Sequence, residues 1–160
     1  MKSMIGIAIA PLLLAAPLVG TAQTLTLKAS GIPAISVGAA ELRAMPHQAV
    51  SETDRGQSHT YGGAPIALVL SRLGVPQGEA VRGKAMATVI VVTGSDGYRV
   101  VLTLPEIDPA FRDEKVLLAD SEDGHLLNAH EGPFRLIVEG DKRQARWVRG
   151  VTTLEVISIP

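Results

Sequence analysis

The chain has 160 residues, with 15 Lys and Arg, 16 Asp and Glu, and no cysteine. This length is typical of one ordinary domain. The net charge of -1 argues against a nucleic-acid-binding protein, which carries a basic excess, and a hydrophobic content of 46% excludes a wholly disordered chain. Without cysteine the chain has no disulfide, no thiolate nucleophile, no iron–sulfur cluster and no Cys-ligated metal.

Residues 1–22 have the pattern of a secretory signal peptide. Lys2 gives a positive start, residues 5–14 form an apolar run, and small residues occupy the positions that precede a cut after Ala22. The alternative is a membrane anchor, but two prolines interrupt the run and it is shorter than the roughly 20 apolar residues that a span needs. We therefore expect export, cleavage after Ala22, and a single domain over residues 23–160.

The first part of this domain is expected to combine a strand, a helix and an extended segment. Residues 25–29 form a strand-like run. Ser36 is placed to N-cap a helix over residues 37–45, which ends at Pro46. Residues 48–52 look extended and lead into a polar stretch.

The clearest helix begins at Pro65, where the missing N–H of proline costs nothing. Apolar residues recur at i, i+3, i+4 and i+7 from Ile66 to Leu73, which predicts one buried face. Gly74 caps this helix, and Pro76 prevents its continuation.

The rest of the chain is predicted to be rich in strands. Strands are expected at residues 88–93, 98–104, 116–119, 134–139 and 147–159, with a helical turn at residues 105–111. The β-branched run 88–93 is typical of a strand that is covered on both sides. Asp-Gly pairs at Asp96 and Asp123 predict tight turns. At least six strands with two or three short helices indicate the α+β class, with a mixed or antiparallel sheet.

Several motifs that would indicate an activity are absent from the sequence. It contains no glycine-rich nucleotide-binding loop and no G-x-S-x-G elbow. Its histidines are too dispersed for a zinc motif, so no metal site is predicted, although His125 and His130 flank one turn. A cluster of basic residues near another turn indicates either an ordinary solvated turn or an anion-binding edge. The cluster consists of Lys142, Arg143, Arg146 and Arg149.

Five stretches resemble, in order and spacing, the oxidoreductase molybdopterin-binding family, which has the sulfite-oxidase-like fold. The first two are Tyr61-Gly-Gly-Ala-Pro-Ile66 and Leu70-Ser-Arg-Leu-Gly74, and the third is the hairpin Ser95-Asp-Gly-Tyr-Arg-Val100. The others are Gly132-Pro-Phe-Arg-Leu-Ile-Val138, after Asp123-Gly124, and Arg146-Trp-Val-Arg-Gly-Val151, leading to Glu155-Val156. The resemblance implies a mostly β, sandwich-like fold with a pterin-shaped pocket built from loops.

The chain departs from this family at one position. Catalytic members hold molybdenum through a cysteine thiolate after the strand that corresponds to residues 48–52. Residues 50–56 of this chain offer only hydroxyls and carboxylates there, and these are poor substitutes for a soft thiolate. The chain is therefore more similar to small exported members that bind reduced pterins in the periplasm. The resemblance implies that such a protein signals to a membrane partner that makes or degrades cyclic di-GMP.

A pterin ring offers a flat face for stacking and an edge of hydrogen-bond donors that a carboxylate can accept. Candidate pterin-binding residues lie at strand ends and turns, where loops converge. They are the acceptors Asp54, Asp96 and Glu131, the rings Tyr61, Tyr98 and Trp147, the cations Arg55 and Arg146, and His130.

Two alternatives stay open. One is a molybdopterin-dependent oxidoreductase that functions without a cysteine ligand. The other is an interaction domain with a vestigial pocket. The missing cysteine favours a binding protein over an enzyme.

Overall fold

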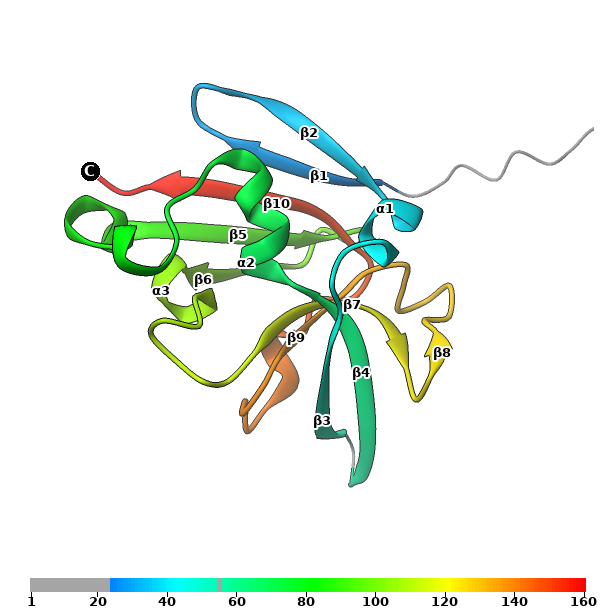
Figure 1. Ribbon diagram of the computed structural model, residues 1–160. Helices are drawn as coiled ribbons and strands as arrows, with labels where there is room; N and C mark the ends of the chain where they lie inside the picture. The colour runs from blue at the N-terminus through cyan, green and yellow to red at the C-terminus, as the bar shows by residue number, and fades with distance from the viewer. Residues whose placement is uncertain (1–23, 55) are drawn as a thin grey trace, which may run out of the picture.

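The computed structural model describes residues 24–54 and 56–160, and these fold into two five-stranded β-sheets (Figure 1). Residues 1–23, Arg55 and the side chain of Asp54 lie outside this description, so the predicted signal peptide lies outside it as well. Within the described part, no helix is both long enough and apolar enough to cross a membrane.

The first sheet has the strand order β2-β1-β10-β5-β6. Its strands are β1 (Thr24–Ala29), β2 (Ile32–Gly38), β5 (Thr88–Gly94), β6 (Arg99–Thr103) and β10 (Val151–Ser158). β1 and β10 are parallel, whereas the other pairs in this sheet are antiparallel. The sheet is therefore mixed, as the sequence predicts.

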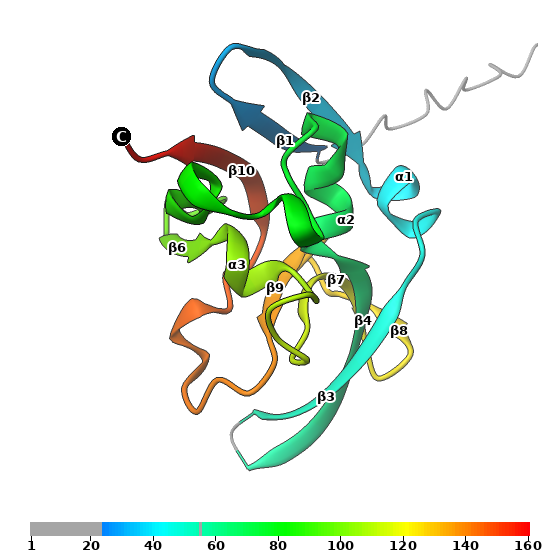
Figure 2. The ribbon, with the colours of Figure 1, turned by 60° about the vertical axis from the view of Figure 1, so that its left-hand side comes forward.

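The second sheet has the order β3-β4-β7-β8, and β9 also pairs with β7. Its strands are β3 (Gln48–Asp54), β4 (Gln57–Pro65), β7 (Val116–Glu122), β8 (His125–Leu126) and β9 (Arg135–Val138). The hairpin of β3 and β4 projects from the body of the molecule in both ribbon views (Figures 1 and 2).

Short helices connect and cover the sheets. They are α1 (Ala39–Arg43), α2 (Ile66–Leu70) and α3 (Leu104–Ile107), with 3₁₀ turns η1 (Ser71–Leu73), η2 (Gly78–Ala80), η3 (Gly83–Ala87) and η4 (Gln144–Arg146). The predicted apolar stripe from Ile66 to Leu73 is buried, and Gly74 adopts the left-handed conformation that ends this helix, with φ of 69°.

One hydrophobic core unites the two sheets. Leu25, Ile90 and Leu154 of the first sheet are fully buried in the same cluster as Leu117 of β7 and Phe134, which directly precedes β9. The strand β5 alternates between buried and half-buried positions. The prediction that it is covered on both sides is therefore right for one face only.

The helix predicted at residues 37–45 is mostly wrong. Ser36 does not cap a helix, because Ser36 and Val37 belong to β2 and pair with Thr26 and Leu25 of β1. The helix α1 covers only five residues, and Gly38 is its N-cap. Pairing with the adjacent N-terminal strand thus outweighs the local helix signal.

The polar stretch after residues 48–52 leads into the long strand β4, which the sequence pattern does not predict. Glycine normally disfavours a strand, but here Gly63 serves close packing. A Cβ atom at Gly63 would collide with the backbone of Leu118 and Ala119 in β7. The close approach of these two strands therefore requires glycine.

The last strand begins at Val151 rather than at residue 147. Arg146 ends η4, and Trp147 follows it in the connection between β9 and β10. Gly150, with φ of 53°, precedes the strand. This connection carries aromatic and charged side chains toward the second sheet.

Candidate ligand-binding site

A buried arginine lies at the centre of the candidate site. Arg135 is on β9, and its side chain is only 2% exposed. Its guanidinium carbon lies 5.1 Å from the ring centroid of Tyr61 and 5.6 Å from that of Trp147. The two rings meet edge to face, with centroids 5.5 Å apart. These distances are those of cation–π contacts, which are strongest away from water.

Among the described side chains, two carboxylates balance this buried cation. Glu131 Oε1 lies 3.3 Å from Arg135 Nη1 and 3.2 Å from Arg149 Nε, so one carboxylate oxygen faces two guanidinium groups. Glu122 Oε2 lies 4.0 Å from the same Nη1. Glu131 was predicted to accept from a pterin, and in this structure its carboxylate is engaged by the two arginines.

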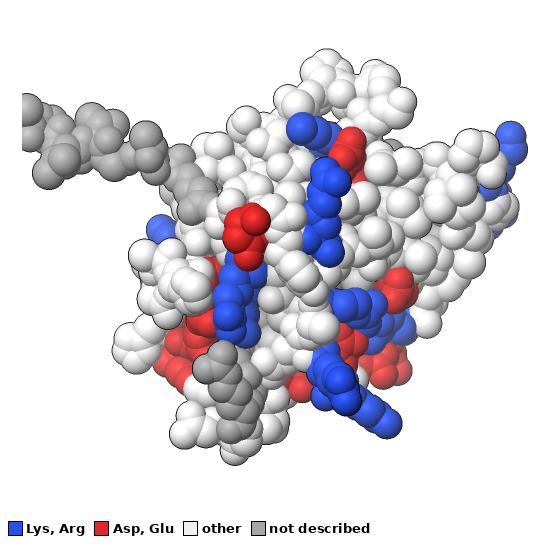
Figure 3. Space-filling view, turned by 180° about the vertical axis from the view of Figure 1, so that it is seen from behind, with Lys and Arg blue, Asp and Glu red and all other residues white. Residues whose placement is uncertain are grey.

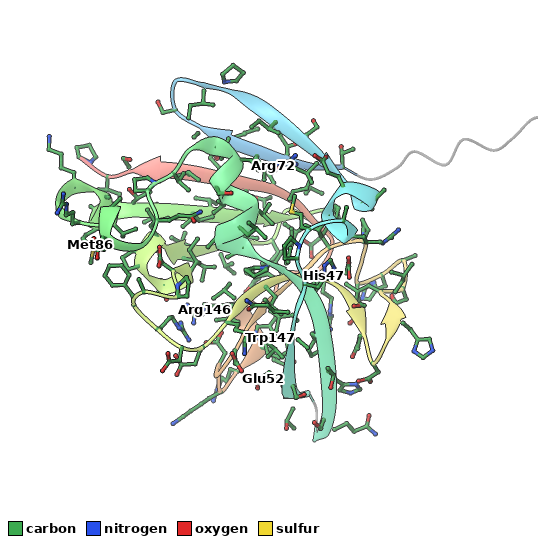
Figure 4. All side chains as sticks on the ribbon, in the orientation of Figure 1. His47, Glu52, Arg72, Met86, Arg146 and Trp147 are labelled. Carbon is green, nitrogen blue, oxygen red and sulfur yellow. The ribbon has the colours of Figure 1, made fainter. Side chains whose placement is uncertain are left out.

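Local hydrogen bonds hold these side chains in place. The backbone N–H of Glu131 donates to Asn128 Oδ1, which shapes the turn before β9. The indole N–H of Trp147 donates to the carbonyl of Val138 at 3.1 Å, on the same strand as Arg135. Trp147 lies in the lower half of the molecule in Figure 4, where β4 and β9 lie. The ring is therefore fixed before any ligand arrives.

A pocket of about 260 Å³ opens beside Arg135 and Trp147. Its other lining residues are Asp96, Tyr98, Gln144, Ala145 and Arg149. The phenol of Tyr98 donates to the carbonyl of Ala145 at 2.7 Å, and Asp96 Oδ1 accepts from the N–H of Tyr98. The β5–β6 hairpin is thereby joined to the loop that carries Trp147. This volume is slightly below the roughly 300 Å³ at which typical small-molecule sites begin, so the pocket has room for no more than a single ring system.

The end of β3 lies next to this pocket. Gln144 Nε2 donates to the carbonyl of Thr53 at 2.9 Å, and the N–H of Gly140 donates to Glu52 Oε1 at 2.7 Å. In the catalytic proteins that the chain resembles, the cysteine follows the strand that corresponds to β3. Of the predicted residues here, Arg55 and the side chain of Asp54 lie outside the described residues.

The structure brings five of the predicted residues together around Arg135, and one of them is Glu131, which forms an ion pair with it. Asp96, Tyr98 and Trp147 line the pocket, and Tyr61 lies behind it against Arg135. His130 is exposed on the turn before β9 and does not line this pocket.

Arg146 does not line the pocket either. Its guanidinium donates to both carboxylate oxygens of Asp141, at 2.6 and 3.0 Å, and to Glu106 Oε1 at 2.9 Å. The Asp141 hydrogen bonds raise the pKa of Arg146 above its ordinary value. Burial raises the pKa of Glu106, but hydrogen bonds from Thr103 and Arg146 outweigh burial and lower it. Arg146 therefore ties α3 to the loop after β9.

Arg135 was missed because it lies within an apolar strand. The sequence did contain one signal, a single charge in the apolar run Phe134-Arg-Leu-Ile-Val138. Because charged residues are almost never fully buried without a partner, this charge indicates that oppositely charged or aromatic groups lie around it. Figure 3, which shows the molecule from behind, has Lys and Arg interspersed with Asp and Glu over the lower half of that face.

The two sheets, their mixed pairing and the short helices define a sulfite-oxidase-like fold. The crystal structure of the sulfane dehydrogenase SoxCD from Paracoccus pantotrophus has this fold: it matches with a TM-score of 0.61 and 17% sequence identity. The match covers 83% of this chain and 37% of that chain, so this chain spans little more than a third of that protein's length. At this identity the likeness establishes the fold alone. No protein-family model matches the chain, and no curated protein matches it significantly.

Proposed function

We propose that this chain is an exported, non-catalytic pterin-binding protein of the periplasm, which acts as a sensor or adaptor for a membrane signalling partner. The observation that carries the proposal is the ring-sized pocket bounded by Trp147, Tyr98 and the two arginines Arg135 and Arg149. Its fold is shared with an oxidoreductase, whereas its sequence lacks the thiolate on which the related enzymes depend.

The lining of the pocket suits the chemistry of a pterin. Tyr98 offers an aromatic face for stacking. Asp96 supplies a carboxylate that can accept from the 2-amino group and N3–H of the ring. Arg149 supplies a guanidinium that can donate to the ring carbonyl. The pocket thus offers complementary groups for the face, the donor edge and the acceptor of one planar ligand.

The same residues do not fit a thiolate-bound molybdenum. The sequence contains no cysteine, and the side chains around the pocket are guanidinium, carboxylate, amide and phenol groups. These hard donors do not substitute for the soft thiolate. The residues present therefore suit the pterin ring rather than the metal. Metal analysis of protein from a molybdenum-replete host tests the oxidoreductase alternative, because stoichiometric molybdenum would support it.

Pterin binding is tested by titrating the purified exported form with tetrahydropterins. Trp147 is the only tryptophan in the chain, so its fluorescence reports directly on the pocket. We expect Tyr98→Ala to weaken binding at least tenfold. Phe111→Ala is the matched control, because Phe111 is similarly exposed (46% against 49% for Tyr98) and does not line the pocket. A flat titration with several reduced pterins would refute pterin binding.

The adaptor role rests on the sequence resemblance and needs a separate test. Deleting the gene is expected to change cellular cyclic di-GMP, and the Tyr98→Ala variant is expected to reproduce that change. If the pocket variant instead restores wild-type levels, the chain acts as an interaction domain whose pocket is vestigial.

A further inference from the structure

A second group of side chains lies outside the pocket, where β4 passes the end of β7. His59 Nδ1 lies 2.8 Å from Asp123 Oδ2 and 3.2 Å from Glu122 Oε1. Strand register brings these groups together, because Tyr61 pairs with Glu122 and the N–H of Asp123 donates to the carbonyl of Thr60 at 2.8 Å. Residues that are far apart in the sequence thus meet at one edge of two paired strands.

The outer oxygen of each carboxylate points toward another group of the protein. Asp123 Oδ1 accepts from the backbone N–H of Thr60 at 2.8 Å. Glu122 Oε2 points toward Arg135, with Nη1 at 4.0 Å. The inner oxygens therefore face His59, and such outer contacts are how proteins orient carboxylates that bind metals.

We propose that His59, Glu122 and Asp123 bind a divalent transition-metal ion. One ligand atom from each residue lies within 4.8 Å of the other two. Bonds of about 2.0–2.2 Å from a central ion to nitrogen and oxygen require ligand atoms about 3–4 Å apart, so the side chains need only small adjustments. This proposal replaces the expectation, drawn from the dispersed histidines, that the chain has no metal site.

The donor set selects among metals. One imidazole with two carboxylates suits Zn²⁺ or Mn²⁺, whereas Ca²⁺ prefers six to eight oxygen ligands. Three protein ligands leave a coordination position for water or an exogenous ligand. Among the described residues, Arg135, His59 and His125 lie near the negative charges of Glu122 and Asp123, and a divalent cation held between the two carboxylates would offset these charges directly.

The test is calorimetric titration of untagged, chelator-treated protein with ZnCl₂, and in parallel with MnCl₂ and CaCl₂. We expect one Zn²⁺ per chain, weaker Mn²⁺ binding and no Ca²⁺ binding. His59→Ala and Glu122→Gln should each weaken Zn²⁺ binding at least tenfold, whereas His130→Ala, which alters an exposed histidine elsewhere, should change it less than threefold.

Two results would overturn the metal site. One is no Zn²⁺ binding below millimolar concentrations. The other is equal weakening by His59→Ala and His130→Ala, which would indicate adventitious surface histidines. Circular dichroism of each variant confirms folding, and the near-isosteric Glu122→Gln keeps the test decisive if His59→Ala unfolds.

Discussion

The guanidinium of Arg135 lies over the ring of Tyr61, with its central carbon 5.1 Å from the ring centroid, in a part of the molecule where both side chains are almost completely buried. Tyr61 comes from β4 and Arg135 from β9, and both strands pair with β7. This contact therefore joins the second sheet across its central strand, and Arg135 also lines the candidate pocket.

Removing Arg135 should destabilise the protein strongly. Arg135→Ala eliminates the contacts with Tyr61 and Trp147 and leaves Glu131 and Glu122 without this buried cation. We expect a loss of about 3 kcal/mol in the free energy of unfolding, measured by urea denaturation. The control Arg143→Ala removes an exposed arginine and should cost less than about 0.5 kcal/mol. Similar losses in the two variants would show that the buried contacts contribute little.

Gly63 should tolerate no side chain. A Cβ atom there meets the backbone of Leu118 and Ala119, so Gly63→Ala must push β4 away from β7. We expect a loss of about 1–3 kcal/mol in the free energy of unfolding. Gly38→Ala is the matched control, because a Cβ atom there meets nothing within 4 Å. Because Gly38 is an N-cap residue, we expect the Gly38→Ala control to lose less than about 1 kcal/mol. If the Gly63→Ala variant were as stable as the Gly38→Ala control, the argument that β4 and β7 approach too closely for a side chain would be contradicted.

His47 should make stability depend on pH. Its Nδ1 lies 2.8 Å from the carbonyl oxygen of Met45 and its Nε2 lies 3.0 Å from Asp120 Oδ2, so both nitrogens donate when the ring is protonated. Burial lowers the pKa of His47, but these two hydrogen bonds outweigh burial and raise it above the ordinary value of 6.5.

Because the folded-state pKa is raised, the His47–Asp120 pair contributes fully below pH 6.5 and loses its contribution as the pH rises through the folded-state value. The contribution of this pair is measured by urea unfolding of the wild type and the His47→Gln variant at about pH 5.5 and about pH 8.5. We expect the stability difference between the two proteins to be larger at the lower pH. A difference that does not change with pH would exclude a charged pair.

Arg146 should matter for stability and not for the ligand. Arg146→Gln breaks the ion pairs with Asp141 and Glu106, and we expect a loss of about 1 kcal/mol that shrinks as salt is added. Pterin affinity, followed by Trp147 fluorescence, should change less than twofold. Lys142→Gln, at an exposed position on the same loop, serves as the control for charge alone. A tenfold loss of pterin affinity in Arg146→Gln would instead show that Arg146 takes part in ligand binding.

Elements with strong local signals are predictable from the sequence. The β-branched run of β5, the Asp-Gly turn before β6 and the helix α2 appear where the pattern places them. The strands β2 and β4 do not. β2 is an edge strand with mostly exposed residues, and β4 contains glycines whose role depends on the approach of β7. β4 depends on a distant partner, because its register pairs Tyr61 with Glu122 of β7, whereas β2 pairs with the adjacent β1 in a hairpin that the local helix signal concealed.

The candidate site divides in the same way. Asp96 and Tyr98 belong to a turn with a clear sequence signal, and Trp147 is the only tryptophan in the sequence. These three residues can therefore be selected as candidate site residues from the sequence. Arg135 is not predictable as a neighbour of Tyr61, because strand register decides that contact. Arg146 looked equally suitable, but its position is decided by Glu106, which belongs to a different segment of the chain.

The parallel pairing of β1 with β10 has a consequence for biosynthesis. The last strand of the chain lies between β1 and β5, so the first sheet cannot form before the C-terminal residues have been translated. Such long-range pairing also folds slowly. In a nascent chain with this topology, the first sheet therefore stays incomplete until β10 (Val151–Ser158) has been made.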